Sequence, residues 1–206
     1  MLAVGGASAP LAPPLRYAPA DAPAALRPAL ARAEEAIRAA ACDVERRFGE
    51  GDPDANAARC DGAHHEPGIE VGRTSARLRN PANAAPAWAR AYVAETDGKK
   101  AAEVAAMAFD LGDRVGLLRP IELRKRCLGC HAAPERTAAS TRAWLARAYP
   151  DDRAWGYTLG DLRGFWWADA PKGEARVPGL PPKAAHHPSQ SPSRSRAMQT
   201  AGGSGQ

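Results

Sequence analysis

A long amphipathic segment opens the patterned part of the chain. Between residues 24 and 48 the large apolar residues recur at helical spacing and form one stripe, made of Leu26, Leu30, Ile37, Val44 and Phe48. This spacing predicts a helix over 24–48. Residues 70–79 alternate instead and carry β-branched side chains, which predicts a strand that ends at Asn80-Pro81.

The second half of the chain predicts a hairpin followed by further short elements. Two apolar runs flank the turn Gly112-Asp113, as in an antiparallel hairpin. The full set of expected elements is a polar loop at 49–68, a helix at 86–95, strands at 101–111 and 114–123, a helix at 137–148 and a strand at 164–168. Helices that flank a small antiparallel sheet predict an α+β fold class.

The two ends of the chain differ from its middle. Residues 1–23 are rich in proline and small residues, and we expect a flexible N-terminus there. The stretch MLAVGGASA ends in an A-x-A pattern, which resembles the remnant of a secretory signal. Residues 179–206 are rich in Pro, Ser and Gly and predict a disordered tail. One domain is therefore expected over 24–178.

Composition and charge argue against a nucleic-acid partner and against a membrane span. The formal net charge is +5, and the arginines are scattered among acidic residues, so we expect no nucleic-acid partner. No apolar run is long enough to span a bilayer, so no membrane span is expected.

The residues that carry chemistry are Cys127-Leu128-Gly129-Cys130-His131, the C-x-x-C-H pattern of c-type haem attachment. Two intervening residues let both thiols reach the two vinyl groups of one haem, and the adjacent histidine becomes an axial iron ligand. The pattern predicts one covalent haem c, and export follows because this attachment takes place outside the bacterial cytoplasm. The alternative is a zinc-stabilised binding module, in which Cys60, His64 or His65 completes the site.

The second axial ligand is open from the residues alone. Thioether, imidazole and thiolate side chains can all bind haem iron, and the candidates are Cys42, Cys60, His64, His65 and Met107. Met107 falls in an expected strand, where a core role competes with ligation. A haem enzyme would need an acid–base group at an open distal site, and only His64 and His65 offer one, so we expect no enzymatic activity.

Several further strings accompany the haem motif. They are Val71-Gly72-Arg73-Thr74-Ser75, Leu78-Arg79-Asn80-Pro81-Ala82-Asn83, Trp88, Leu118-Arg119-Pro120-Ile121, Tyr149-Pro150-Asp151-Asp152, Gly156-Tyr157 and Gly160-Asp161-Leu162-Arg163-Gly164. In order and spacing the chain resembles a bacterial family of haem c-binding PAS-like sensor domains, long catalogued as a domain of unknown function. The resemblance spans roughly residues 30–170.

The resemblance implies a PAS-like fold, a covalent haem and a role in redox sensing or electron transfer with a separate, unknown protein partner. It also implies that Cys42, on the N-terminal helix, is the second axial ligand beside His131. Two features depart from the family pattern: the loop 49–68 is longer and holds rival ligands, and a proline-rich end follows residues 165–167.

Arginine side chains are candidates to bind the haem propionates, because the planar guanidinium pairs well with carboxylates. Arg73, Arg77 or Arg79 is expected to do so, and Asn80 either joins them or only sets a turn. Asp161 and Arg163 are expected to stabilise a turn.

Overall fold

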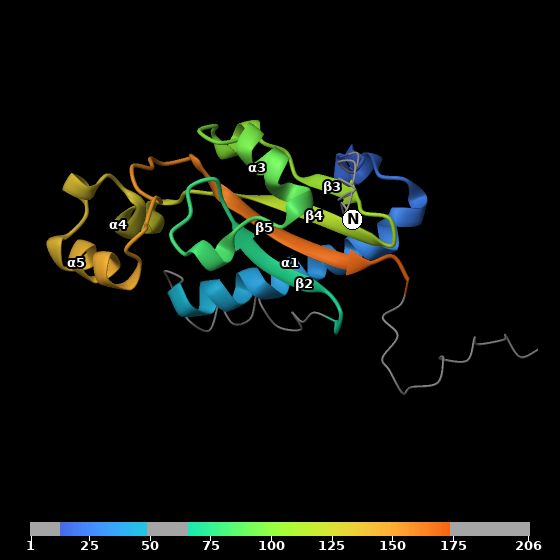
Figure 1. Cartoon of the computed structure of the whole chain (residues 1–206), viewed down its shortest axis with the longest axis horizontal. Helices are drawn as coiled ribbons and strands as arrows, with labels where there is room; N and C mark the ends of the chain where they lie inside the picture. The colour runs from blue at the N-terminus through green and yellow to red at the C-terminus, as the bar shows by residue number, and fades with distance from the viewer. Residues whose placement is uncertain (1–12, 49–65, 174–206) are drawn as a thin grey trace, which may run out of the picture. The chain divides into compact units, whose positions relative to one another are not determined.

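The structure is a computed structural model, which describes residues 13–48 and 66–173. Its centre is a five-stranded antiparallel sheet in the order β1-β3-β4-β5-β2 (Figure 1). The strands are β1 (Arg16–Tyr17), β2 (Glu70–Thr74), β3 (Met107–Asp110), β4 (Arg114–Glu122) and β5 (Leu162–Pro171). The α-helices are α1 (Arg27–Phe48), α3 (Arg90–Glu95), α4 (Leu128–His131) and α5 (Ala139–Ala148). This mixture confirms the predicted α+β class.

Side chains along the strands point alternately to the two faces of the sheet, so the core has two layers. Val115 and Leu117 of β4 face α1, in a cluster with Ala29, Ala33 and Ile37. Leu118 faces the other way, toward a cluster formed with α3 and the turn before it. In Figure 1, α1 runs along one face of the sheet and α3 lies over the opposite face. Ala29, Ala33 and Ala36 of α1 are fully buried in the first of these clusters.

The observed elements differ from the expected ones mainly at their ends. Strand β2 ends at Thr74 because the Ser75 hydroxyl accepts a hydrogen bond from the Arg77 amide at 2.9 Å and turns the chain. The strand expected from residue 101 begins only at Met107. Residues 101–103 form a 3₁₀ turn instead, in which the Glu103 carboxylate accepts from the Lys100 amide at 2.9 Å.

Strand β5 is longer than predicted, and strand β1 was not predicted. Strand β5 extends to Pro171, well beyond the expected 164–168, because its alternate residues pack on both faces of the sheet. Strand β1 lies in the N-terminal stretch expected to be flexible, and it pairs with β3 through Arg16 and Tyr17. A two-residue strand has no detectable periodicity, so only the pairing reveals it. The expected tail at 179–206 lies outside the described residues.

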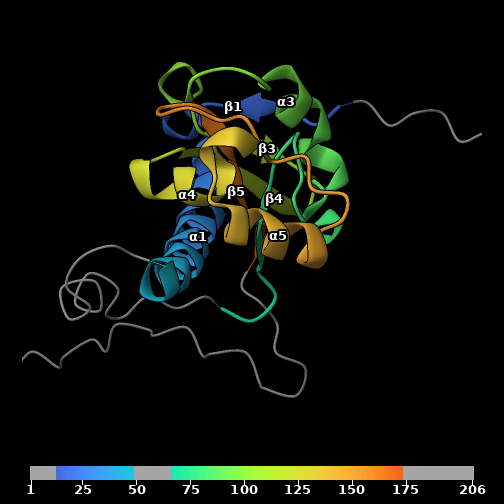
Figure 2. The same cartoon turned by 90° about the vertical axis from the view of Figure 1, so that its left-hand side faces the viewer.

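The end of β4 leads directly into the cysteine-containing segment. Figure 2 looks onto this end of the sheet, where α4 and α5 lie nearest the viewer. A third, small core cluster of Leu123, Ala154 and Tyr157 supports it, with Cys127 and Leu128 packed against that cluster. The amide of Leu123 donates to the Asp161 carbonyl at 2.9 Å, and the Gly160 amide donates to the Leu123 carbonyl at 3.0 Å. These bonds attach the start of the segment to the residues just before β5.

Candidate functional site

Cys127 and Cys130 lie on one short helical segment. Cys127 closes a 3₁₀ turn over Lys125–Cys127, and α4 then carries Cys130 and His131. Both cysteines have free thiols and both are partly exposed. The segment therefore presents two reactive thiols within about one turn, next to an imidazole.

The His131 ring is held in one tautomer. Its Nδ1 lies 2.8 Å from the Ala154 carbonyl oxygen, which can only accept, so Nδ1 carries the proton. The Nε2 lone pair is left available, and the Arg163 Nε–H donates toward it at 3.5 Å. Burial lowers the pKa of His131 to about 3, with the nearby Arg163 guanidinium contributing in the same direction. The imidazole is therefore neutral at pH 7, the form that binds a metal.

Tyr157 fixes the histidine from a second direction. Its amide donates to the His131 carbonyl at 3.0 Å. The two rings meet edge to face, with centroids 6.0 Å apart. Because Tyr157 and Ala154 are both buried, the orientation of the imidazole depends on the packed loop 152–157.

Arg163 is the site residue that sequence reasoning missed, having assigned it to a turn. Its guanidinium lies 5.3 Å from the centre of the Tyr157 ring, and one nitrogen donates to the Arg77 carbonyl at 3.5 Å. Within the described part of the chain, no carboxylate lies in ion-pair distance of it. Burial lowers the pKa of Arg163. The only sequence signal was its place in the GDLRG string.

The three arginines expected at the site have different surroundings. Arg73 is exposed, with its guanidinium 5.3 Å from the centre of the Trp166 ring. Arg77 lies over the Tyr157 ring at 3.9 Å. Arg79 is occupied by protein groups: it pairs with Asp152 and donates to the Cys130 carbonyl.

Asn80 has a local structural role. Its side-chain oxygen accepts from the Ala82 amide at 3.0 Å and caps the 3₁₀ turn at Pro81–Asn83. This contact agrees with the expectation that Asn80 sets a turn.

The candidates for a second axial ligand are only partly described. Cys42 lies near the C-terminal end of α1, and that end of the helix points toward the end of the sheet that carries α4 (Figures 1 and 2). Cys42 is disulfide-bonded here, so its sulfur would bind iron only after reduction. Met107 packs against the core cluster on the α3 side of the sheet. Cys60, His64 and His65 lie outside the described residues.

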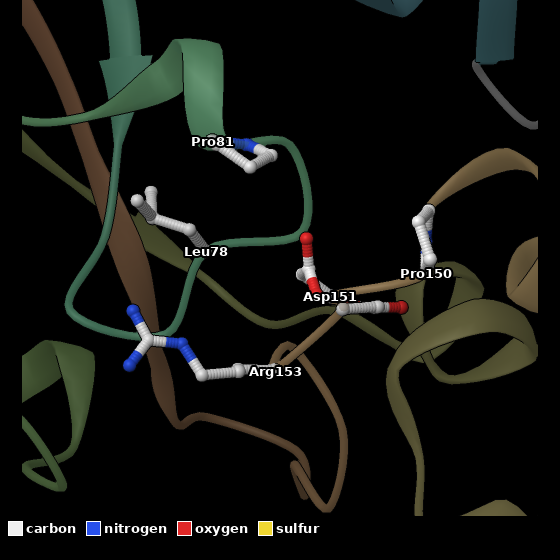
Figure 3. Close-up of a pocket in the computed structure, with 6 residues that line it drawn as sticks. Leu78, Pro81, Pro150, Asp151 and Arg153 are labelled. Atoms are coloured by element: carbon white, nitrogen blue, oxygen red, sulfur yellow. The ribbon is translucent and has the colours of Figure 1, made fainter.

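An open groove of about 460 Å³ lies next to the histidine site, not in it. Figure 3 shows Leu78 and Pro81, from the segment after β2, lying opposite Pro150. Asp152 is shared between the two places, since it lines the groove and also contacts Ala154. The three motif residues Cys127, Cys130 and His131 do not line the groove.

Among residues 13–48 and 66–173, no three His, Cys, Asp or Glu side chains come together as a metal site would require. None of the described helices combines the length and the apolar character that crossing a membrane demands.

Comparison with known proteins identifies the family. The Tll0287-like family model matches residues 25–171, well over half of the chain. Among solved structures, the crystal structure of the cyanobacterial heme-protein Tll0287 matches with 29% identity and a TM-score of 0.43, over 51% of this chain and 62% of that one. A search of curated proteins found no match. Because the family model covers well over half of the chain, including strands β2 to β5, α1 and the CLGCH segment, the chain belongs to the Tll0287-like family.

Proposed function

We propose that this protein binds one haem covalently, through thioether bonds from Cys127 and Cys130 and an iron bond from Nε2 of His131. The observation that carries the proposal is the hydrogen bond from His131 Nδ1 to the Ala154 carbonyl. A backbone acceptor on Nδ1 orients the ring and strengthens Nε2 as a metal ligand. The cyanobacterial relative is itself described as a heme-protein.

The two thiols suit the attachment chemistry. Each S–H adds across one vinyl group, so the sulfur bonds to the inner vinyl carbon while the hydrogen goes to the outer one. The addition needs no oxidant or reductant. Both thiols are free and partly exposed, which leaves them accessible to a haem that approaches α4.

The charges around the site also suit haem. The guanidinium of Arg163 has no carboxylate partner among the described residues, and neither has that of Arg73, which lies over the Trp166 ring. A haem propionate supplies the missing anion, because a carboxylate pairs with the guanidinium fork. We assign the propionate contact to Arg163 and Arg73, since Arg79 is already paired with Asp152.

Cys42 is the proposed second axial ligand. Helix α1 packs on the sheet, and its C-terminal end points toward the end of the sheet that carries α4 (Figure 2). Because Cys42 is disulfide-bonded here, ligation would follow reduction of that bond. A thiolate would lower the potential of the iron.

In function, we propose an exported redox sensor or small electron carrier of PAS-like fold, with no catalytic activity of its own. When bound, haem supplies a one-electron couple, and this chain orients it and sets its charge surroundings. The signal or electron would pass to a separate protein. Zinc binding is the alternative. The residues that would complete a zinc site with Cys127 and Cys130, namely Cys60, His64 or His65, lie outside the described residues.

The test is expression of the full chain in a bacterium that matures c-type cytochromes. We expect haem that stays with the polypeptide after denaturation, with absorption bands typical of two thioether links. The double variant Cys127→Ala/Cys130→Ala should lose it, while Cys42→Ala, which removes a cysteine outside the motif, should keep it. A protein that holds zinc and no covalent haem would overturn the proposal in favour of the alternative.

A further inference from the structure

The ion pair between Arg79 and Asp152 joins the segment after β2 to the loop after α5. Arg79 Nε donates to Asp152 Oδ2 at 2.8 Å, and the two side chains are only 13% and 5% exposed. Among the ion pairs between described residues, it is the least exposed. Loss of either partner leaves a poorly solvated charge uncompensated, so the two residues hold each other in place.

Both members of the pair also contact the residues that hold His131. Asp152 Oδ1 accepts from the Ala154 amide at 2.8 Å. One Arg79 nitrogen donates to the Cys130 carbonyl at 2.6 Å and reaches the Ala154 carbonyl at 3.5 Å. The Ala154 carbonyl is the acceptor for His131 Nδ1. The pair therefore bonds to the residue before His131 and to the peptide that orients its ring.

We propose that Arg79 and Asp152 are positioning residues for the axial histidine and that their opposite charges adjust the reduction potential of the iron in opposite directions. The inference rests on the proposed function, because it requires iron at Nε2 of His131. Arg79 belongs to the LRNPAN segment and Asp152 to the YPDD segment, so the inference assigns both segments the same role of positioning His131.

The direction of each effect follows from simple electrostatics. Arg79 shares the Ala154 carbonyl with His131, which weakens the hydrogen bond from Nδ1 and makes Nε2 a poorer donor to iron. Its positive charge also disfavours the more positive, oxidised iron. Both effects raise the potential. The Asp152 carboxylate compensates Arg79 and favours the oxidised iron, so it lowers the potential.

The experiment compares four variants of the haem-loaded full chain by spectroelectrochemical titration. Arg79→Gln should lower the reduction potential, and Asp152→Asn should raise it, each shifting the redox equilibrium several-fold. The double variant Arg79→Gln/Asp152→Asn should return close to the wild type, because it removes both charges. Asp152→Glu, which keeps the charge, should stay near the wild type.

Arg114 and Asp169 provide a matched control. They form another partly buried ion pair between strands, with side chains 30% and 16% exposed. Arg114 begins β4, whereas the haem motif follows its other end, about 26 Å away along the strand. Arg114→Gln and Asp169→Asn should destabilise the fold without moving the potential.

Shifts of the same sign in both single variants, or no shift, would overturn the inference, since a merely structural pair predicts no sign reversal. If a single variant fails to fold, the double variant and Asp152→Glu provide the test. A large shift of the reduction potential in either of them would contradict the inference. Covalent haem retention is measured in parallel on a denaturing gel. Absence of haem in the wild type counts against the proposed function, whereas retained haem with unmoved potentials counts against this inference alone.

Discussion

Nδ1 of His131 lies 2.8 Å from the carbonyl oxygen of Ala154, a residue 23 positions further along the chain. The contact crosses from α4 to the loop 152–157, and it leaves Nε2 as the unprotonated nitrogen, which accepts a hydrogen bond from Arg163. The orientation of the His131 ring, the proposed iron ligand, therefore depends on the loop 152–157 as well as on α4.

The first prediction concerns Cys42. In haem-loaded protein treated with a disulfide reductant, Cys42→Ala should change the absorption spectrum of the oxidised iron, because a thiolate ligand is lost. The same variant should behave like the wild type without reductant, since the wild-type sulfur is then held in its disulfide. An identical spectrum under both conditions would assign the ligand to Cys60, His64, His65 or Met107. Met107→Leu should leave the spectrum unchanged under both conditions, because Met107 packs against the core cluster beside α3.

The second prediction concerns Arg163. A partly buried guanidinium without a carboxylate partner in the described region costs free energy in the haem-free protein. Arg163→Gln should therefore keep or raise the stability of the haem-free chain, by up to about 1 kcal/mol in chemical denaturation. In haem-loaded protein the same variant should lower the reduction potential, because a cation near the iron is removed. A large loss of stability in the haem-free variant would instead indicate a purely structural arginine.

The third prediction concerns Asp161, whose carboxylate caps the turn before β5. It accepts from the Thr158 amide at 2.6 Å and from Lys100 Nζ at 2.5 Å. Burial alone raises the pKa of Asp161, but the hydrogen bonds from Lys100 and Thr158 outweigh burial and lower it overall. Asp161→Asn should cost about 1–2 kcal/mol of unfolding free energy at pH 7.

The stabilisation by Asp161 should depend on pH. A carboxyl whose folded pKa is lowered contributes stability above its unfolded pKa and loses it as the pH falls through the folded value. The stability gap between wild type and Asp161→Asn should therefore close on acidification below about pH 4, the region of an unperturbed aspartate. A gap that stays constant down to strongly acidic pH would mean that the charge is not what stabilises the turn.

The fourth prediction concerns Gly164, the last residue of the GDLRG string. Its φ is +150°, and a Cβ there would lie 2.1 Å from the Thr74 carbonyl oxygen. Gly164→Ala should force β5 away from the end of β2 and cost more than about 2 kcal/mol in denaturant unfolding. Gly173→Ala is the control, because a Cβ at Gly173 meets nothing within 4 Å and its backbone is unstrained. Equal stability of the two variants would contradict the close contact.

The spacing of apolar residues predicted most of the helices and strands. Buried positions recur at a fixed interval along a helix or strand, so the sequence itself shows them. Leu30 and Ile37 lie on the face of α1 that packs on the sheet, and Leu26, in the 3₁₀ turn just before α1, belongs to the same core cluster. The alternation of Val115, Leu117 and Leu118 assigns β4 to its two layers. Element ends were less predictable, because side-chain bonds at Ser75 and Glu103 determine where β2 stops and where β3 starts.

For the site, the sequence alone determined the chemistry: two thiols and an imidazole in C-x-x-C-H spacing, which depends only on neighbouring positions along the chain. Only the tertiary structure decided which nitrogen of His131 is unprotonated, that Arg163 faces it, and that Arg79 is bound to Asp152 instead of being available to a propionate. These contacts join residues 23 to 73 positions apart. Such distances carry no periodic signal, because folding of the loops, and not local spacing, brings the partners together.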